Sequence, residues 1–165
     1  MKTLFKDEPF HRVMQLIDSI HIKNRQVAER ALRPLDMTYP QLGTLMALHL
    51  GDGITQRELA DALETDKTTV TVLCDSLEKK GWLKRTPDAT DRRMKRIVLT
   101  ESGRNAYSRA LERLETEHEY MENRVSAAEL ERTIPFLEDL HRNVNGLLQR
   151  KDARRSRPRT ADLKE

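Results

Sequence analysis

Apolar residues recur at helical spacing through most of the chain. Between residues 10 and 32 they follow helical spacing, interrupted by a polar patch around 23–26, and Pro34 ends the segment. A second helix is expected to begin at Thr38, where Gln41 completes a capping-box pattern, and to end near Gly51. These patterns predict a protein that is mainly α-helical.

The middle of the chain has shorter periodic segments. A capping box that begins at Thr55 opens a short helix, and Thr65 or Asp66 caps a longer helix predicted over 66–80. This is the pattern of a helix-turn-helix, and a hairpin is expected to follow it. Two strand-like segments flank a polar, turn-prone stretch: 82–85 and 96–99.

The last third of the chain reads as two long helices and a tail. Thr100 is expected to start a polar helix that reaches about Asn123, and Ser126 opens a final helix through a third capping box. Pro135 should kink this helix or displace its start. The segment 151–165 is basic without apolar periodicity and is predicted to be disordered. Apolar residues of the final helix alternate three and four apart: Leu130, Ile134, Leu137, Leu140, Val144 and Leu147.

The predicted elements combine into a winged helix-turn-helix joined to a helical dimerisation base. The fold class is mainly α with a small β-hairpin wing. Residues 38–99 form the predicted DNA-binding lobe, and residues 8–34 and 100–150 form the predicted dimerisation region. A small lobe cannot cover the apolar seam of the final helix, so a second copy of the chain is expected to cover it.

Charge and composition point to a polyanion as the partner. The chain has 165 residues, a net charge of +3 and 35% charged residues. Basic residues concentrate at 84–96 and 150–159, and the rest is net acidic. Aromatic residues are only 4%, which disfavours stacking on single strands or RNA. A single cysteine and the lack of an apolar leader or spanning segment predict a cytoplasmic protein with no membrane partner.

The predicted 66–80 helix has one apolar face and one small, polar face. Val70, Leu73, Cys74 and Leu77 follow helical spacing and should face inward. Small hydroxyl side chains near the start of such a helix can reach base edges in a major groove. The alternative is that they are ordinary capping and surface residues. The candidates for DNA contact on this helix are Lys67, Thr68, Thr69, Thr71, Val72 and Ser76.

The turn between the two strands is a candidate wing, predicted over 86–95. Arg92, Arg93 and Lys95 are its candidate DNA contacts, because an arginine at such a tip can enter a narrow minor groove. The alternative is a solvated loop in which Asp88 and Asp91 pair with the arginines. Lys95 and its neighbours would then contact only phosphate or solvent.

Several motifs together make the chain similar to the multiple-antibiotic-resistance regulator (MarR) family over about residues 10–149. Asp91-Arg92-Arg93, followed after five residues by Leu99-Thr100, resembles the family's wing signature. Where many relatives carry arginine this chain has Val72, and Pro135 and the basic tail also depart from the pattern. The other matching segments are ITQRELADAL (54–63), DKTTVT (66–71) and LEKKG (77–81).

The resemblance implies a homodimeric, ligand-responsive regulator, usually a repressor, that binds pseudo-palindromic duplex DNA. It implies that Arg93 enters the minor groove and that Asp91 braces it. The threonines of the 66–80 helix would contact bases or phosphates in the major groove. A small aromatic or anionic effector would bind between the dimer base and the lobe, and no cofactor is expected.

The candidate effector residues come from the first two predicted helices. Arg25 could pair with a carboxylate, and Tyr39 or His21 could orient a phenol. The alternative places Met46 in the core and His49 on the surface at a helix end. All five are therefore weak candidates compared with the DNA-binding residues.

Other kinds of site are disfavoured. Cys74 lies on the predicted inward face, where a small buried thiol with no redox role is expected. Glu115, His118 and Glu122 share a helical face, but in a charged helix such residues are usually solvated, so no metal site is predicted. No enzyme motif is present, so no catalytic residue is expected. The alternative from another class is a protein-interaction module, which the basic wing disfavours.

Overall fold

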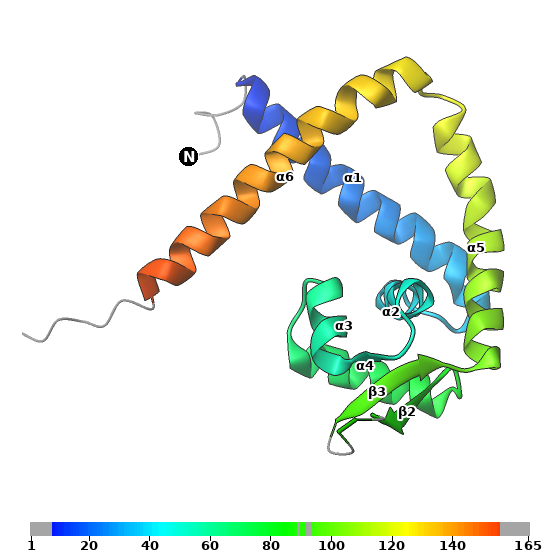
Figure 1. The fold of residues 1–165 in the computed structure, drawn as a ribbon. Coiled ribbons are helices and arrows are strands. Elements are labelled where there is room, and N and C mark those ends of the chain that lie inside the picture. Colours follow the sequence, from blue (N-terminus) through cyan, green and yellow to red (C-terminus); the bar gives the residue numbers. More distant parts are fainter. Residues whose placement is uncertain (1–7, 89, 92–93, 156–165) are drawn as a thin grey trace, which may run out of the picture. The chain divides into compact units, whose positions relative to one another are not determined.

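The computed structural model describes residues 8–88, 90–91 and 94–155, with the backbone alone from residue 149 onward (Figure 1). The chain divides into two compact units, Met1–His118 and Glu119–Glu165. The elements in chain order are α1 (Pro9–Leu32), the 3-10 turn η1 (Arg33–Leu35), α2 (Tyr39–Leu50), β1 (Ile54–Thr55), α3 (Gln56–Ala62), α4 (Lys67–Lys79), β2 (Leu83–Pro87), β3 (Lys95–Leu99), α5 (Glu101–Glu122) and α6 (Ala127–Arg155).

The predicted helix starts are confirmed by their hydrogen bonds. Thr38 and Thr55 each form a complete capping box at the start of α2 and α3. Ser126 does the same for α6, since its hydroxyl accepts from the Glu129 amide at 3.2 Å and its own amide donates to the Glu129 carboxylate at 3.2 Å. Of the two candidates for α4, Asp66 is the cap.

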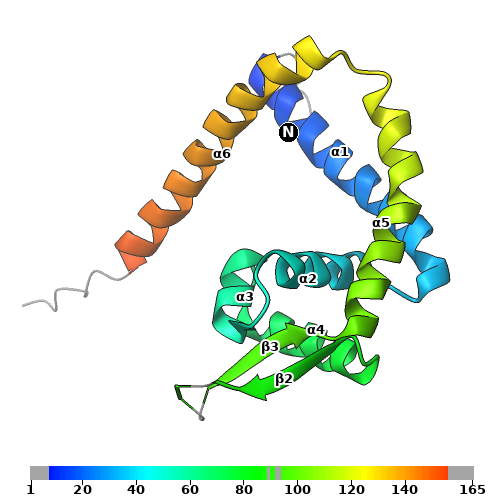
Figure 2. The ribbon, with the colours of Figure 1, turned by 45° about the vertical axis from the view of Figure 1, so that its right-hand side comes forward.

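The sheet has three antiparallel strands in the order β1-β3-β2, one more than the sequence predicts. Ile54 of β1 pairs with Ile97 of β3, and Leu83 of β2 pairs with Leu99. A two-residue strand carries no periodicity, so β1 is defined only by its partner across the sheet. Figure 2 shows α2, α3 and α4 beside the sheet, with the β2–β3 hairpin extending from the same lobe.

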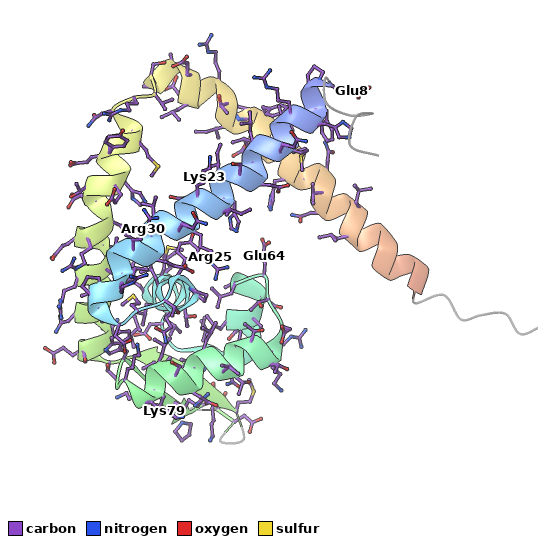
Figure 3. The ribbon with its side chains drawn as sticks, turned by 180° about the vertical axis from the view of Figure 1, so that it is seen from behind. Glu8, Lys23, Arg25, Arg30, Glu64 and Lys79 are labelled. Carbon is purple, nitrogen blue, oxygen red and sulfur yellow. The ribbon has the colours of Figure 1, made fainter. Side chains whose placement is uncertain are left out.

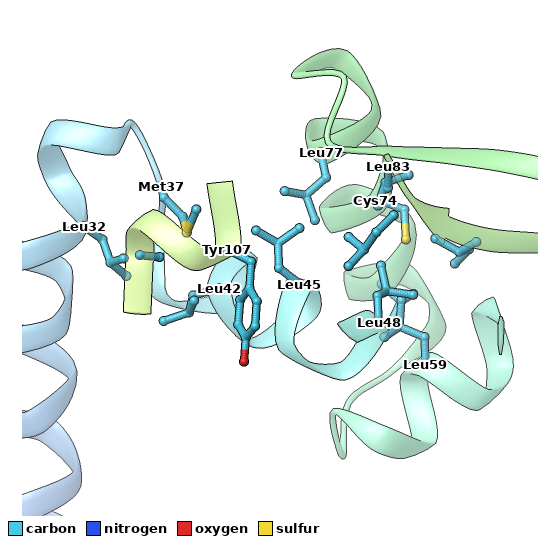
Figure 4. Close-up of a cluster of buried hydrophobic side chains, with 14 of the residues drawn as sticks. Leu32, Met37, Leu42, Leu45, Leu48, Leu59, Cys74, Leu77, Leu83 and Tyr107 are labelled. Atoms are coloured by element: carbon cyan, nitrogen blue, oxygen red, sulfur yellow. The ribbon is translucent and has the colours of Figure 1, made fainter. Parts of the chain in front are cut away.

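A continuous apolar core holds the lobe together (Figure 4). Apolar side chains of α2, α3, α4 and the sheet meet there and exclude water, which is the main stabilising contribution to a lobe of this size. Fully buried members include Leu45, Leu48, Leu59, Val70, Cys74, Leu77, Leu83 and Ile97. The predicted fold class, mainly α with a small β-hairpin wing, is confirmed.

The second unit contains α6, which begins at Ala127, directly after the predicted cap Ser126, and continues through Pro135, so of the two effects expected of the proline the displaced start does not occur. The helix differs from the prediction at its end, Arg155, which lies five residues into the segment expected to be disordered. Apolar periodicity indicates which residues are buried, and its absence does not exclude a helix. The segment 149–155 is rich in Gln, Arg, Lys and Ala, which favour helix formation by themselves.

Many apolar side chains of α6 remain exposed, among them Leu130, Ile134, Leu137, Val144 and Leu147. Within the ranges given above, no helix combines the length and apolar content that are needed to cross a membrane.

Candidate nucleic-acid interface

Helix α4 presents a small, mixed surface to solvent. Val70, Cys74 and Leu77 are buried as predicted, and Leu73 is half-buried. Val72, on the opposite side, is 64% exposed. Figure 3 shows Lys79 projecting from the same helix. The exposed row, spaced four, three and four apart, is Thr68, Val72, Asp75 and Lys79.

The hydroxyl groups of α4 differ in their hydrogen bonds. The Thr69 hydroxyl donates to the Asp66 carboxylate at 2.8 Å, and the Thr71 hydroxyl donates to the Lys67 carbonyl at 2.8 Å. Both bonds lie within the first two turns of α4. Each hydroxyl would therefore have to share its hydrogen bond, or exchange its acceptor, in order to bind DNA. Thr68 and Lys67 are exposed beside them.

Ser76 does not face solvent, although it was predicted to contact DNA from the outer face of this helix. It is half-buried, and its hydroxyl accepts a hydrogen bond of 2.8 Å from the Gln41 side chain of α2. Gln41 is itself 6% exposed. Ser76 therefore connects α4 to α2. Helical spacing alone does not show that Ser76 lies beside α2 rather than among the exposed residues of α4.

Arg85 connects α4 to the hairpin. Its guanidinium forms ion pairs with Asp75, at 2.6 Å, and with Glu78, and its side chain is only 17% exposed. Its amide also donates to the Glu78 carboxylate at 3.2 Å. Charge-assisted bonds in a partly buried setting are stronger than surface ion pairs. The orientation of β2 is therefore coupled to that of α4.

The base of the wing is organised by Asp88, which is 5% exposed. Its carboxylate accepts from the Thr90 amide at 2.7 Å, the Thr90 hydroxyl at 2.6 Å and the Asp91 amide at 3.0 Å, and it also pairs with Arg96. Two backbone bonds close the loop, from Asp88 to the Met94 carbonyl and from Met94 to the Asp91 carbonyl.

These bonds have two consequences for the wing. The Thr90 hydroxyl, then the backbone amides and Arg96, hold the pKa of Asp88 far below its ordinary value, so it is charged at neutral pH. Arg96 also donates to the Gly53 carbonyl at 2.7 Å, which links the wing to the turn before β1. Of the predicted wing contacts, Lys95 is exposed, whereas Arg92 and Arg93 lie outside the described residues.

Thr100, the last residue of the wing signature, connects the lobe to α5. Its hydroxyl accepts from the Gly103 amide at 3.0 Å, which caps α5, and donates to the Gly81 carbonyl at 2.6 Å. Asp52 reinforces this connection by accepting from the Leu99 amide at 2.9 Å and from Arg104 at 2.7 Å. The end of the hairpin and the start of α5 therefore form one unit.

Cys74 is buried in the core of the lobe, with 0% exposure. Burial raises the pKa of its thiol to about 11, so the reactive thiolate form is scarce at neutral pH. In the described ranges no group of three or more His, Cys, Asp or Glu side chains is arranged to hold a metal ion. Glu115, His118 and Glu122 do not form such a group.

A cavity of about 220 Å³ lies between α1, α2 and α5 of the first unit. Tyr39 and Met46, two of the predicted effector residues, line it. His49 lies beside the cavity rather than in its wall, with its ring 4.8 Å from that of the lining residue Tyr107. The complete lining is Asn24, Ala28, Tyr39, Leu42, Gly43, Met46, Tyr107, Leu111, Leu114 and His118.

The two remaining effector candidates are outside the cavity wall. Arg25 forms an ion pair of 2.9 Å with Glu29 on the surface of α1 (Figure 3). His21 is exposed on the same helix. Asn24 of α1 lines the cavity whereas Arg25, the next residue, does not, because successive side chains of a helix point about 100° apart.

Sequence reasoning missed the connecting residues of this surface. Charge and turn patterns identify Asp88 only as an acidic loop residue, although Asp88-x-Thr90 directly after a proline is the pattern of an Asx turn. They identify Arg85 only as one of several basic residues. Its partners Asp75 and Glu78 are ten and seven residues away in the sequence, and no local pattern identifies them.

Comparisons with known proteins place this geometry among characterised regulators. The model of the MarR family matches residues 35–94. A structure of MepR from S. aureus in complex with DNA is 30% identical, with a TM-score of 0.71, and the match covers 78% of this chain and 94% of that one.

Two further solved structures are similar over comparable lengths. A MarR mutant from E. coli complexed with operator DNA is 25% identical, with a TM-score of 0.72 and coverage of 81% of this chain and 98% of that one. CouR from Rhodococcus jostii RHA1, bound to p-coumaroyl-CoA, is 25% identical, with a TM-score of 0.69 and coverage of 78% and 90%.

Proposed function

This chain belongs to the MarR family of DNA-binding transcription regulators, and from that premise we propose how it acts. We propose that it is a ligand-responsive repressor that binds a pseudo-palindromic duplex as a homodimer. In this proposal α4 enters the major groove and the wing reaches the adjacent minor groove. Its activity is regulatory rather than enzymatic.

One observation carries the proposal. The exposed row of α4 stands beside a basic hairpin, in a fold shared with MepR and MarR proteins that were solved on DNA. Lys67, Lys84 and Lys95 are exposed on α4, β2 and β3, so positive charge is present on each of these elements. Neutralising phosphates in this way supplies most of the affinity of such proteins and makes it depend steeply on salt.

Sequence preference is assigned to a few side chains. Thr68 and Val72 are exposed, and they can contact a base edge and a thymine methyl. Thr69 and Thr71 serve as further base or phosphate contacts. The resemblance assigns the minor-groove contact to Arg93 and its bracing to Asp91. Ser76 supports α4 through Gln41 instead of reading DNA.

A homodimer is proposed because each unit exposes apolar side chains that a monomer leaves in water. On α1 these include Leu16 and Ile20, and on α6 they include Ile134 and Leu147. Exposed apolar surface of this extent marks an interaction site. A twofold dimer would also match the symmetry of a pseudo-palindromic operator.

The proposed function is tested by selecting duplex DNA from a random pool with the full chain. An inverted-repeat consensus is expected, with affinity that falls steeply as salt rises. Recovery of no consensus would contradict specific DNA reading and favour a protein-interaction module. A reporter gene placed behind the selected site then tests repression.

The assignment of Arg93 is tested on the selected site. Arg93→Ala should weaken binding by about 1–3 kcal/mol and relax sequence preference under the wing, because a minor-groove contact is lost. Arg113→Ala, an equal charge change at an exposed position of α5, is the matched control. Unchanged affinity and preference in Arg93→Ala would contradict the assignment.

A further inference from the structure

We propose that α4 reads its operator chiefly through the C5-methyl groups of thymine or 5-methylcytosine, which its own methyl groups contact in the major groove. The inference rests on the proposed function, which places α4 in that groove, and it adds the chemical class of base that the helix selects. It departs from the sequence-based expectation that the hydroxyl groups of this helix reach base edges.

Two threonine hydroxyls in the first half of α4 are already donating within the helix. The Thr71 hydroxyl donates to the Lys67 carbonyl at 2.8 Å. The Thr69 amide and hydroxyl donate to the Asp66 carboxylate at 3.0 Å and 2.8 Å, and they hold the pKa of Asp66 below its ordinary value. A hydroxyl has a single hydrogen to donate, so neither threonine can donate to a base without breaking its present bond.

The part of these side chains that is left for a partner is apolar. A threonine side chain branches into a hydroxyl and a methyl group, so once the hydroxyl is bonded within the helix the methyl group is the branch that remains. Val72 adds two further methyl groups and is 64% exposed. Thr68 and Thr69 precede Val72 by four and three residues, which makes them its neighbours on the helix surface. Thr69 is exposed and Thr71 is half-buried.

The polar groups of the following turn are also engaged. The Asp75 carboxylate forms an ion pair of 2.6 Å with Arg85. The Ser76 hydroxyl accepts from the Gln41 side chain at 2.8 Å. Within residues 8–88, 90–91 and 94–148, Thr68 carries the one hydroxyl of α4 that makes no hydrogen bond inside the protein. Hydrogen-bond readout by this helix is therefore reduced to a single free hydroxyl beside a group of methyls.

The surface of α4 matches a methylated pyrimidine. Thymine carries a methyl group at C5, on the major-groove edge, and 5-methylcytosine carries one at the same position. Packing it against the methyl groups of α4 removes apolar surface from water. Guanine and adenine present acceptors instead, which arginine, lysine or a side-chain amide reads. The groups of that kind on α4 are Lys67 and Lys79, its first and last residues.

The first test changes the DNA. In the duplex that the full chain selects, each thymine is replaced in turn by deoxyuridine, which lacks only the methyl group. At least one thymine in each half-site should show a loss of about fourfold in affinity, and replacement in both half-sites a loss of about 15-fold, because one methyl contact is lost in each. At that position 5-methylcytosine·guanine should bind about fourfold more tightly than cytosine·guanine. Thymines outside the consensus are the control.

The second test changes the protein with a matched pair at one position. Thr71→Val keeps the methyl group and loses the hydroxyl, so affinity should stay within about twofold of the unchanged chain. Thr71→Ser keeps the hydroxyl and loses the methyl group, so affinity for the duplex with two half-sites should fall by about 15-fold. Val72→Ala should reduce the deoxyuridine effect at the thymine that Val72 contacts to less than about twofold.

Three results would overturn the inference: unchanged affinity when every consensus thymine is deoxyuridine, a deoxyuridine effect that persists at every thymine in Val72→Ala, or tighter binding by Thr71→Ser than by Thr71→Val. Each can occur while sequence-specific binding is intact, and each then contradicts the inference and leaves the proposed function standing. Recovery of no consensus duplex contradicts the proposed function, and the inference with it.

Discussion

At the scale of single residues, Asp88 shows how a buried carboxylate can hold the base of the loop that we propose as the wing. Its carboxylate is the acceptor for Thr90, Asp91 and Arg96 together. Residues that are already held in place lose less conformational entropy when they contact a partner, which in the proposed function is the minor groove. Asp88 is therefore a positioning residue, and its effect should be separable from that of a phosphate contact.

Asp88→Asn should lower affinity for the selected duplex and leave the slope of affinity against salt unchanged. The amide removes the charge that accepts from Arg96 and two amides, but it removes no contact with phosphate. Fluorescence anisotropy over a salt series measures both quantities. Asp61→Asn, at an exposed position of α3, is the control. A shallower salt slope in Asp88→Asn would mean that the change acts on a phosphate contact instead.

The lowered pKa of Asp88 also predicts how the wing responds to acid. A carboxylate with a lowered pKa contributes its full stabilisation above its ordinary pKa, near about 3.9, and loses it as the pH falls further. Protection of the Thr90 and Asp91 amides from hydrogen exchange should therefore be constant between neutral pH and about 5 and decrease below about 4. A decrease already near neutral pH would contradict this assignment.

At the scale of elements, the connection between the sheet and α5 depends on a glycine. A Cβ atom built at Gly103 would lie 1.9 Å from the carbonyl oxygen of Trp82 and 2.8 Å from its carbonyl carbon. Only glycine lets the first turn of α5 approach the backbone this closely. The Thr100 hydroxyl stabilises the same junction, because it bonds both the Gly81 carbonyl and the Gly103 amide.

Gly103→Ala should destabilise the protein by about 3 kcal/mol in urea unfolding, because backbone rather than a flexible side chain must move. Gly43→Ala is the matched control. Its added carbon would meet only Leu63, at 3.9 Å, so it should be neutral or stabilise α2 by up to about 1 kcal/mol. Equal stability of the two variants would show that α5 can shift away from the sheet at little cost.

The hydrogen bond between Gln41 and Ser76 is a second junction, between α2 and α4. Gln41→Met and Ser76→Ala should each destabilise the protein, and the double variant should show a coupling of about 1 kcal/mol, because each single change leaves a polar partner unsatisfied. Urea unfolding of the four proteins measures the coupling. Strict additivity would mean that the two side chains do not interact in solution.

At the scale of the whole molecule, the proposed dimer depends on apolar side chains that neither unit buries by itself. The exposed apolar residues of α6 follow the seam expected for a helix that packs against another helix. The exposed row of α4 belongs to a different unit from α6. Dimerisation and DNA reading can therefore be perturbed separately.

Leu147→Glu should convert the dimer to a monomer, because it places a charge in the apolar seam of α6, where Leu147 is 59% exposed in the single chain. Sedimentation measures the change in mass. Affinity for the two-half-site duplex should fall by roughly 100-fold or more, since the advantage of linked binding is lost. Glu138→Gln, at an exposed position of the same helix, is the control. A dimer that persists in Leu147→Glu would place the interface elsewhere.

The sequence by itself determined where the helices start, most of their caps and the winged helix-turn-helix. These features depend on interactions within a few residues, such as the capping box at Thr55, and on a periodicity that reports which face is buried. The buried positions Val70, Cys74 and Leu77 were predictable for the same reason. The family motifs added the expected role of the wing.

Only the tertiary structure decided which polar side chains meet. Asp75 and Ser76 are adjacent polar residues, and the helical pattern does not distinguish their surroundings. In the structure Ser76 accepts a hydrogen bond from Gln41 of α2, whereas Asp75 forms an ion pair with Arg85 of β2. The third strand and the cavity wall depend likewise on segments far apart in sequence. Local patterns record how far a position is buried, but a hydrogen bond or an ion pair also needs a partner at the right distance, and only the packed chain supplies that distance.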